Sequence, residues 1–139
     1  MLDEFAIQQT LNTYSDGASR ADWNQLLSTF TPECIWEIPA LKARYQGHSV
    51  IQKVMSSFVE QMSYFVQINS PAIIAVEGDK ATARSVIREC GKFCDRNEAL
   101  EVLGRYEDEL IRTAAGWKFT RRAFHAAGKH TFALLPDAR

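Results

Sequence analysis

The spacing of apolar residues changes about halfway along the chain, and this change most restricts the possible fold. In the first half, Ile7, Leu11, Tyr14 and Ala18 recur at steps of three or four, which places them on one face of a helix. From about residue 64 onward the spacing becomes two, which is typical of strands with one buried face. Helices followed by consecutive strands predict an α+β protein and argue against alternating β-α-β units.

Two further helices are expected before the strands begin. Asp22 with Gln25, and Ser49 with Gln52 after the turn at Gly47, form capping-box patterns that mark helix starts. We expect the second helix to bury Trp23, Leu26, Leu27 and Phe30, and the third to bury Val50, Val54, Met55, Phe58 and Met62. Strands are expected at 34–39, 64–77, 80–90, 99–112 and 117–127, with turns at 77–80, 91–97 and 113–116.

Length and charge restrict the class of protein. The 139 residues predict one domain spanning 1–139, and 16 basic against 17 acidic residues leave a net charge of −1. Without a basic stripe we expect no nucleic-acid partner, and without an apolar run of roughly 18–20 residues we expect no membrane partner. The start Met1-Leu2-Asp3-Glu4 lacks the basic and apolar parts of a signal peptide, so we expect a cytoplasmic protein.

The three cysteines, Cys34, Cys90 and Cys94, are odd in number and form no CxxC motif. A metal site at Cys90 and Cys94 would need two more ligands, and no His lies at a matching spacing. We therefore expect reduced, partly buried thiols and no metal.

The strand at 99–112 places a carboxylate on its inward face. Arg105, Glu107 and Glu109 alternate on one face, which must meet water, so Asp108 lies on the apolar face. A regular hairpin through 113–116 places Asp108 opposite Arg121, with His125 four residues further along the same face.

Several motifs in order resemble the nuclear transport factor 2-like superfamily, in particular its SnoaL-like and ketosteroid-isomerase-like branch. They are Tyr14 in an early helix, Asp22-Trp23, Pro39, Gly47, Gly104-Arg105-Tyr106-Glu107-Asp108 and Gly116-Trp117-Lys118-Phe119. The resemblance implies three N-terminal helices packed on a strongly curved, mixed, mainly antiparallel sheet that forms a cone with an internal pocket. It also implies a small hydrophobic ligand, no obligatory cofactor, and a homodimer through the outer sheet face.

The catalytic residues of these relatives carry over only in part. Tyr14 and Asp108 match the oxyanion-hole pair of ketosteroid isomerases, but their proton-moving aspartate falls on Ile38. The His–Asp pair of related dehydratases and dehydrochlorinases falls on Phe65 and Ser19. Both familiar catalytic sets are therefore incomplete.

The remaining candidates for catalysis are Tyr14, Asp108, Arg121 and His125, with Glu89 and Asn69 as further inward polar residues. Asp108 or His125 would act as base and Tyr14 with Arg121 would stabilise an oxyanion, but Asp108 and Arg121 could equally form a buried ion pair. The expected substrate-binding residues are Trp36, Ile38, Phe65, Asn69, Ile87, Tyr106, Trp117 and Phe119.

Two functions remain open at this point. The first is a small-molecule enzyme of the SnoaL-like type that removes a proton from a hydrophobic carbonyl compound during cyclisation, isomerisation or elimination. The alternative is a non-catalytic ligand-binding or assembly module with the same cone.

Overall fold

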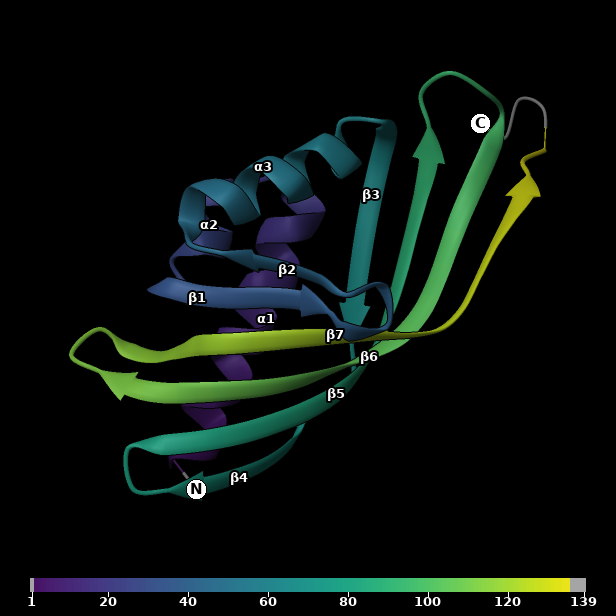
Figure 1. The fold of residues 1–139 in the computed structure, drawn as a ribbon. Helices are drawn as coiled ribbons and strands as arrows, with labels where there is room; N and C mark the ends of the chain where they lie inside the picture. Colours follow the sequence, from purple (N-terminus) through teal and green to yellow (C-terminus); the bar gives the residue numbers. More distant parts are fainter. Residues whose placement is uncertain (1, 136–139) are drawn as a thin grey trace.

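The computed structural model describes residues 2–135 and shows helices packed on one strongly curved, seven-stranded sheet (Figure 1). The α+β layout predicted from the sequence is confirmed. None of the helices in the described range is long and apolar enough to cross a membrane. The helices are α1 (Leu2–Arg20), α2 (Trp23–Leu27), the 3-10 helix Pro39–Leu41, and α3 (His48–Val59). The strands are β1 (Phe30–Ile38), β2 (Ala43–Gln46), β3 (Met62–Asn69), β4 (Ile73–Glu77), β5 (Lys80–Phe93), β6 (Glu98–Thr113) and β7 (Gly116–Ala133).

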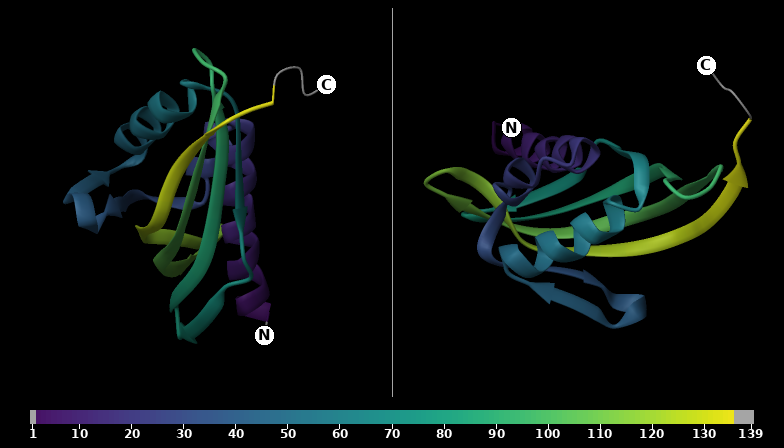
Figure 2. Two further views of the ribbon diagram at one scale, coloured as in Figure 1. Left: turned by 90° about the vertical axis from the view of Figure 1, so that its right-hand side faces the viewer. Right: turned by 90° about the horizontal axis from the view of Figure 1, so that it is seen from above.

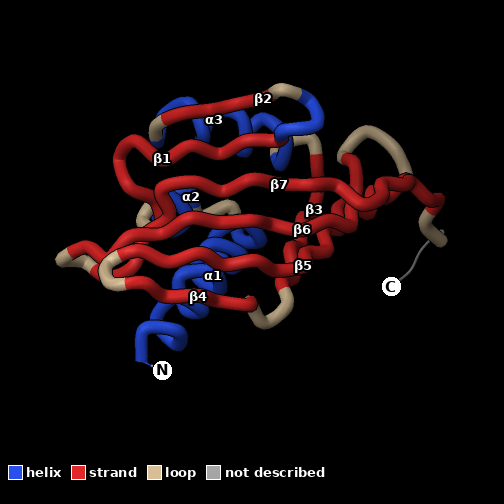
Figure 3. Tube along the Cα trace, turned by 60° about the horizontal axis from the view of Figure 1, so that its bottom comes forward, coloured by secondary structure: helices blue, strands red, loops and turns tan. Residues whose placement is uncertain are grey.

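The sheet has the order β2-β1-β7-β6-β5-β3, and β4 pairs with the first half of β5 (Figure 3). All pairs are antiparallel except β1 with β7, which makes the sheet mixed. The long strands β5, β6 and β7 bend along their length, and α1 lies along one side of the curved sheet (Figure 2). The result is an open cone, because β2 and β3 are edge strands of the sheet and do not pair with each other.

Helix α1 forms as its apolar spacing predicts. Ile7, Leu11, Tyr14 and Ala18 are all buried, at 0–5% exposure. At the start of α2, Asp22 accepts a hydrogen bond of 3.1 Å from the backbone N–H of Gln25, so the predicted cap is confirmed.

The predicted start of α3 is wrong. This helix begins at His48 after Gly47, which has a φ of 89° and makes no side-chain cap. Ser49 therefore lies inside the first turn and cannot cap it. The buried face of α3 carries Ile51 and Met55, whereas Val50 remains 45% exposed.

Several strand boundaries also differ from the expectation. Phe30 begins β1 instead of ending α2, and Met62 begins β3 instead of ending α3. The predicted strand at 64–77 is two strands, since Pro71 has no N–H and lies in the break between β3 and β4.

A β-bulge in the β6–β7 hairpin changes which residues of β7 face inward. Pairing is regular as far as Leu110 with Phe119, but Glu109 then pairs with Arg121, so Thr120 is an extra residue. A slip of one residue moves every following side chain to the opposite face. Arg122 therefore lies opposite Asp108, and the prediction that Arg121 does so is wrong.

Candidate functional site

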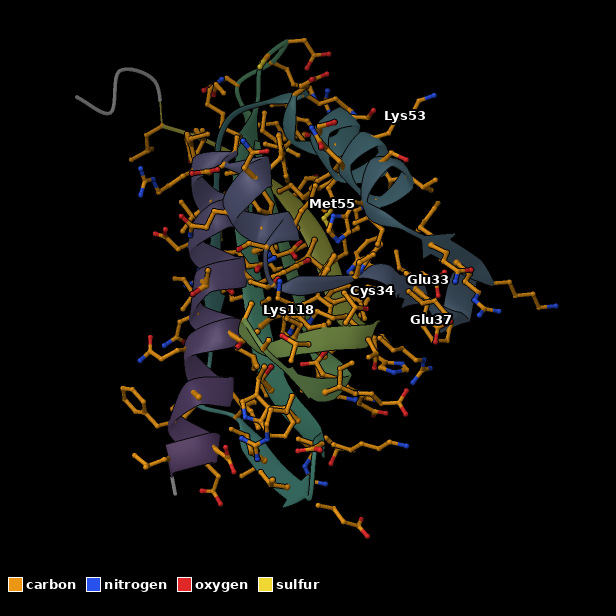
Figure 4. All side chains as sticks on the ribbon, turned by 90° about the vertical axis from the view of Figure 1, so that its left-hand side faces the viewer. Glu33, Cys34, Glu37, Lys53, Met55 and Lys118 are labelled. Atoms are coloured by element: carbon orange, nitrogen blue, oxygen red, sulfur yellow. The ribbon has the colours of Figure 1, made fainter. Side chains whose placement is uncertain are left out.

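A cavity of about 500 Å³ lies between the concave face of the sheet and the helices. This volume is in the range of small-molecule sites. Its wall is mostly apolar and includes several aromatic rings, namely Trp36, Tyr45, Phe58, Phe65 and Phe124. Helix α3 covers one side, with Met55 on its inner side and Lys53 on its outer side (Figure 4).

Half of the expected substrate-binding residues line this cavity. Trp36, Ile38, Phe65 and Tyr106 do so, and so does Tyr14 from the expected catalytic set.

The other four expected binding residues lie elsewhere. Ile87 and Phe119 are core residues, at 1% and 0% exposure, and Trp117 donates to Asp3 of α1 at 3.2 Å. Asn69 donates to the carbonyl of Ser70 at the end of β3. Helix α1 packs against β7 near the hairpin, as the contacts of Trp117 show, and fills that end of the cone.

Asp108 and Arg122 form a fully buried, bidentate ion pair. The Arg122 Nε and Nη2 atoms donate to the two Asp108 carboxylate oxygens at 2.8 and 3.0 Å, and the two side chains are 2% and 0% exposed. The guanidinium also stacks on the rings of Tyr14, Tyr106 and Phe119, at 4.3, 3.8 and 4.2 Å. Burial raises the pKa of Asp108, and Arg122 counteracts that rise. Asp108 is therefore held in a buried ion pair, but its partner is Arg122 and not the expected Arg121.

Arg121 and His125 lie on the convex face of the sheet, away from the cavity. Arg121 is paired with Glu37, and with Glu109 at 3.6 Å. The His125 ring lies 3.9 Å from the Glu107 carboxylate. The prediction that Arg121 and His125 face inward is wrong, because the bulge at Thr120 turns both of them outward.

Two tyrosine hydroxyls meet at the cavity wall. The Tyr14 and Tyr106 oxygens are 3.2 Å apart, and the Trp36 indole N–H donates to the Tyr106 oxygen at 3.2 Å. Either tyrosine can donate to the other, and the second hydroxyl proton then has no strong acceptor among these groups. The Met55 sulfur, 4.0 Å from the Tyr14 oxygen, is a weak one. Burial raises the pKa of Tyr106 to about 12 and raises that of Tyr14 well above its usual value, so both phenols stay protonated.

Among the described residues that line the cavity, Glu89 of β5 is the one with a carboxylate. Its Oε1 atom accepts a hydrogen bond of 2.9 Å from Gln67, whose own amide oxygen accepts one of 3.0 Å from Ser15. Burial raises the pKa of Glu89, and the Gln67 hydrogen bond offsets part of that rise. From the sequence, Glu89 is expected to face inward but not to take part in catalysis. The sequence does contain a signal, because Glu89 is a charged residue within a row of small and apolar inward residues on β5, between Ile87 and Gly91.

Comparison with protein families matches residues 1–123 to the model of the SnoaL-like domain. An uncharacterised protein of Mycobacterium tuberculosis is 26% identical over 121 residues, which cover 86% of this chain and 82% of the relative.

Solved structures share the whole architecture. A candidate aromatic ring hydroxylase from Novosphingobium aromaticivorans is 26% identical with a TM-score of 0.84, over 96% of this chain and 94% of that one. A candidate scytalone dehydratase from the same species is 21% identical with a TM-score of 0.83, over 100% and 99%. A nuclear transport factor 2-like protein from Salmonella enterica is 18% identical with a TM-score of 0.82, over 91% and 92%. The expected superfamily fold is confirmed.

Proposed function

The chain belongs to the SnoaL-like domain family, and from this premise we propose that it is a cofactor-independent enzyme of the isomerase or lyase type. Its substrate is a small hydrophobic carbonyl compound, and Glu89 removes a proton from the carbon next to the carbonyl. The observation that carries the proposal is the position of Glu89, a carboxylate held by a neutral amide inside an apolar cavity. A candidate scytalone dehydratase with the same fold is consistent with this class of reaction.

The surroundings of Glu89 suit a general base. A carboxylate whose pKa is raised by burial is a stronger base than one in water, and proton transfer is most efficient when that pKa approaches the working pH. Gln67 binds only the Oε1 atom, which leaves Oε2 for a substrate proton. The hydrogen bond from Ser15 holds Gln67 and thereby orients the carboxylate.

The tyrosine pair suits the role of oxyanion stabiliser. Proton removal next to a carbonyl places negative charge on the carbonyl oxygen, which a positioned hydrogen-bond donor stabilises. Tyr14 and Tyr106 retain one hydroxyl proton that no strong acceptor of their own network uses. Their high pKa values keep this proton in place at neutral pH.

Deuterium exchange tests the proposal without knowledge of the natural substrate. With 2-tetralone in D2O, NMR measures how fast the protons next to the carbonyl are replaced. We expect the wild type to accelerate exchange and Glu89→Gln to lower the catalysed rate by roughly 10²–10⁴-fold, the usual contribution of a general base. The control is Glu33→Gln, which removes the same charge from an exposed site on β1 (Figure 4). Equal catalysed rates in Glu89→Gln and wild type would show that Glu89 is not the base.

A second candidate function is a ligand-binding module without catalysis. Asp108, the acid that the family resemblance points to, is held entirely by Arg122. None of the described residues that line the cavity is a histidine. If the protein is such a binding module, calorimetry would show that 2-tetralone binds, while the rate of its proton exchange would equal the rate in buffer without protein.

A further inference from the structure

Lys129 is the only cationic side chain among the described residues that line the cavity. It lies on β7 directly opposite Val102 of β6, which in turn lies opposite Glu89 of β5. Directly paired residues on neighbouring strands point to the same face, so all three side chains face the cavity. Two strand spacings separate the Glu89 and Lys129 backbones by about 10 Å.

A second register shift in β7 is what turns Lys129 inward. Gly104 pairs with Ala126 and Leu103 with Gly128, so Ala127 is an extra residue. With regular pairing, inward Ala126 would be followed by inward Gly128, and Lys129 would point outward.

Among the described residues, no acceptor binds the Lys129 ammonium group. Within residues 2–135 no carboxylate lies within 4 Å of it. Lys92 is a useful contrast, because its ammonium group donates to the carbonyls of Phe93 and Arg96 and so holds a loop. Lys129 makes no comparable contact with residues 2–135 and lines the mostly apolar cavity.

We infer that the cavity takes an apolar compound carrying one carboxylate, which pairs with Lys129 while the rest of the molecule lies among the aromatic rings. The ion pair between the ligand carboxylate and Lys129 is inferred from the cavity alone, whereas the placement of the reacting carbon at Glu89 rests on the proposed function. A single ammonium group can neutralise one negative charge. A phosphate would add a second charge near the Glu89 carboxylate without a second cation to bind it, so a monoanion fits better.

Matched probes of equal shape test this inference by calorimetry. The probes are 2-naphthylacetic acid, which is anionic at pH 7.5, and 2-naphthylacetamide, which is neutral. We expect the wild type to bind the acid about 3- to 10-fold more tightly, as one partly exposed ion pair allows. Lys129→Met should abolish this preference and Lys129→Arg should keep it. Lys53→Met is the matched control, because it removes the same charge from the outer side of α3 (Figure 4) and should keep the preference.

The outcomes separate this inference from the proposed function. Equal affinity of the wild type for acid and amide, or a preference that survives in Lys129→Met, would overturn the carboxylate inference and leave the exchange experiment unaffected. Loss of exchange in Glu89→Gln with an intact acid preference would support both. If the wild type binds neither probe, the inference that the cavity takes an apolar carboxylate is overturned.

Discussion

The variant Arg122→Met tests the buried ion pair and the register of β7 at once. Methionine keeps an unbranched apolar side chain at this position, but it leaves the Asp108 carboxylate, whose side chain is 0% exposed, without its two hydrogen bonds. Breaking one side of a buried pair in this way costs about 3–5 kcal/mol. The lost stacking on Tyr14, Tyr106 and Phe119 acts in the same direction.

The double variant Asp108→Leu/Arg122→Met should be less damaging than the single one. Both charges are removed together, and apolar replacements of a buried pair are often neutral or stabilising. The Arg122 Nη1 atom is buried without a hydrogen-bond partner, so the native pair itself carries a cost that the double variant removes.

Urea and thermal unfolding measure these effects. For a chain of this size about 1 kcal/mol corresponds to roughly 3–4 °C in the melting temperature, so Arg122→Met should melt about 10–20 °C lower. The control is Arg121→Met, next in sequence but on the convex face and 39% exposed, which should change stability by at most about 1 kcal/mol. Two results would refute this prediction: a loss of stability in Arg121→Met as large as that in Arg122→Met, or a loss of less than about 1 kcal/mol in Arg122→Met.

Three further predictions concern pH, packing and assembly. The pKa of Glu89 is raised above its usual value of 4.5, so the folded state binds more protons than the unfolded state and loses stability as the pH rises from 4.5 through the raised pKa. Glu89→Gln removes this pH-dependent loss of stability, so the variant should have a higher melting temperature than the wild type at pH 8 but not at pH 4. A difference in melting temperature that stays constant across the pH series would contradict the prediction. In Gly104→Ala the new Cβ would lie 2.7 Å from the His125 carbonyl oxygen, so the free energy of unfolding measured in urea should fall by about 1–3 kcal/mol. The control is Gly128→Ala, whose new Cβ meets no atom within 4 Å and should leave the free energy of unfolding almost unchanged. The family resemblance predicts a homodimer through the outer sheet face, where Val86 is 63% exposed. Sedimentation velocity should therefore show a dimer for the wild type and a monomer for Val86→Glu, and a monomeric wild type would refute the expectation.

The buried face of α1 and the order of helices and strands along the chain were predictable because they depend on local spacing alone. The burial of Ile7, Leu11 and Tyr14 follows directly from their positions on one face of α1. The partner of Asp108 was not predictable in the same way. Arg121 and Arg122 are adjacent and equally basic, so regular and bulged pairing both place an arginine opposite Asp108. Only the position of the extra residue, Thr120, decides between them.

The sequence alone also did not show how deep within the cone a residue lies. Alternation shows that Asp108 and Glu89 both face inward, but it does not show which of them α1 and the aromatic rings cover. Lys129 was missed for another reason. The last strand was expected to end at 127, whereas β7 continues to Ala133 and contains the second register shift.

The two inward carboxylates differ in what compensates their burial, and this difference separates their roles. Burial raises the pKa of both. Asp108 faces a full cation in bidentate contact, so protonating it would leave Arg122 unpaired in the core, and its charge is fixed. Glu89 is held by the neutral amide of Gln67, so gaining or losing a proton strands no buried cation. A carboxylate in the second environment can transfer a proton during a reaction, whereas one in the first can only hold the sheet together.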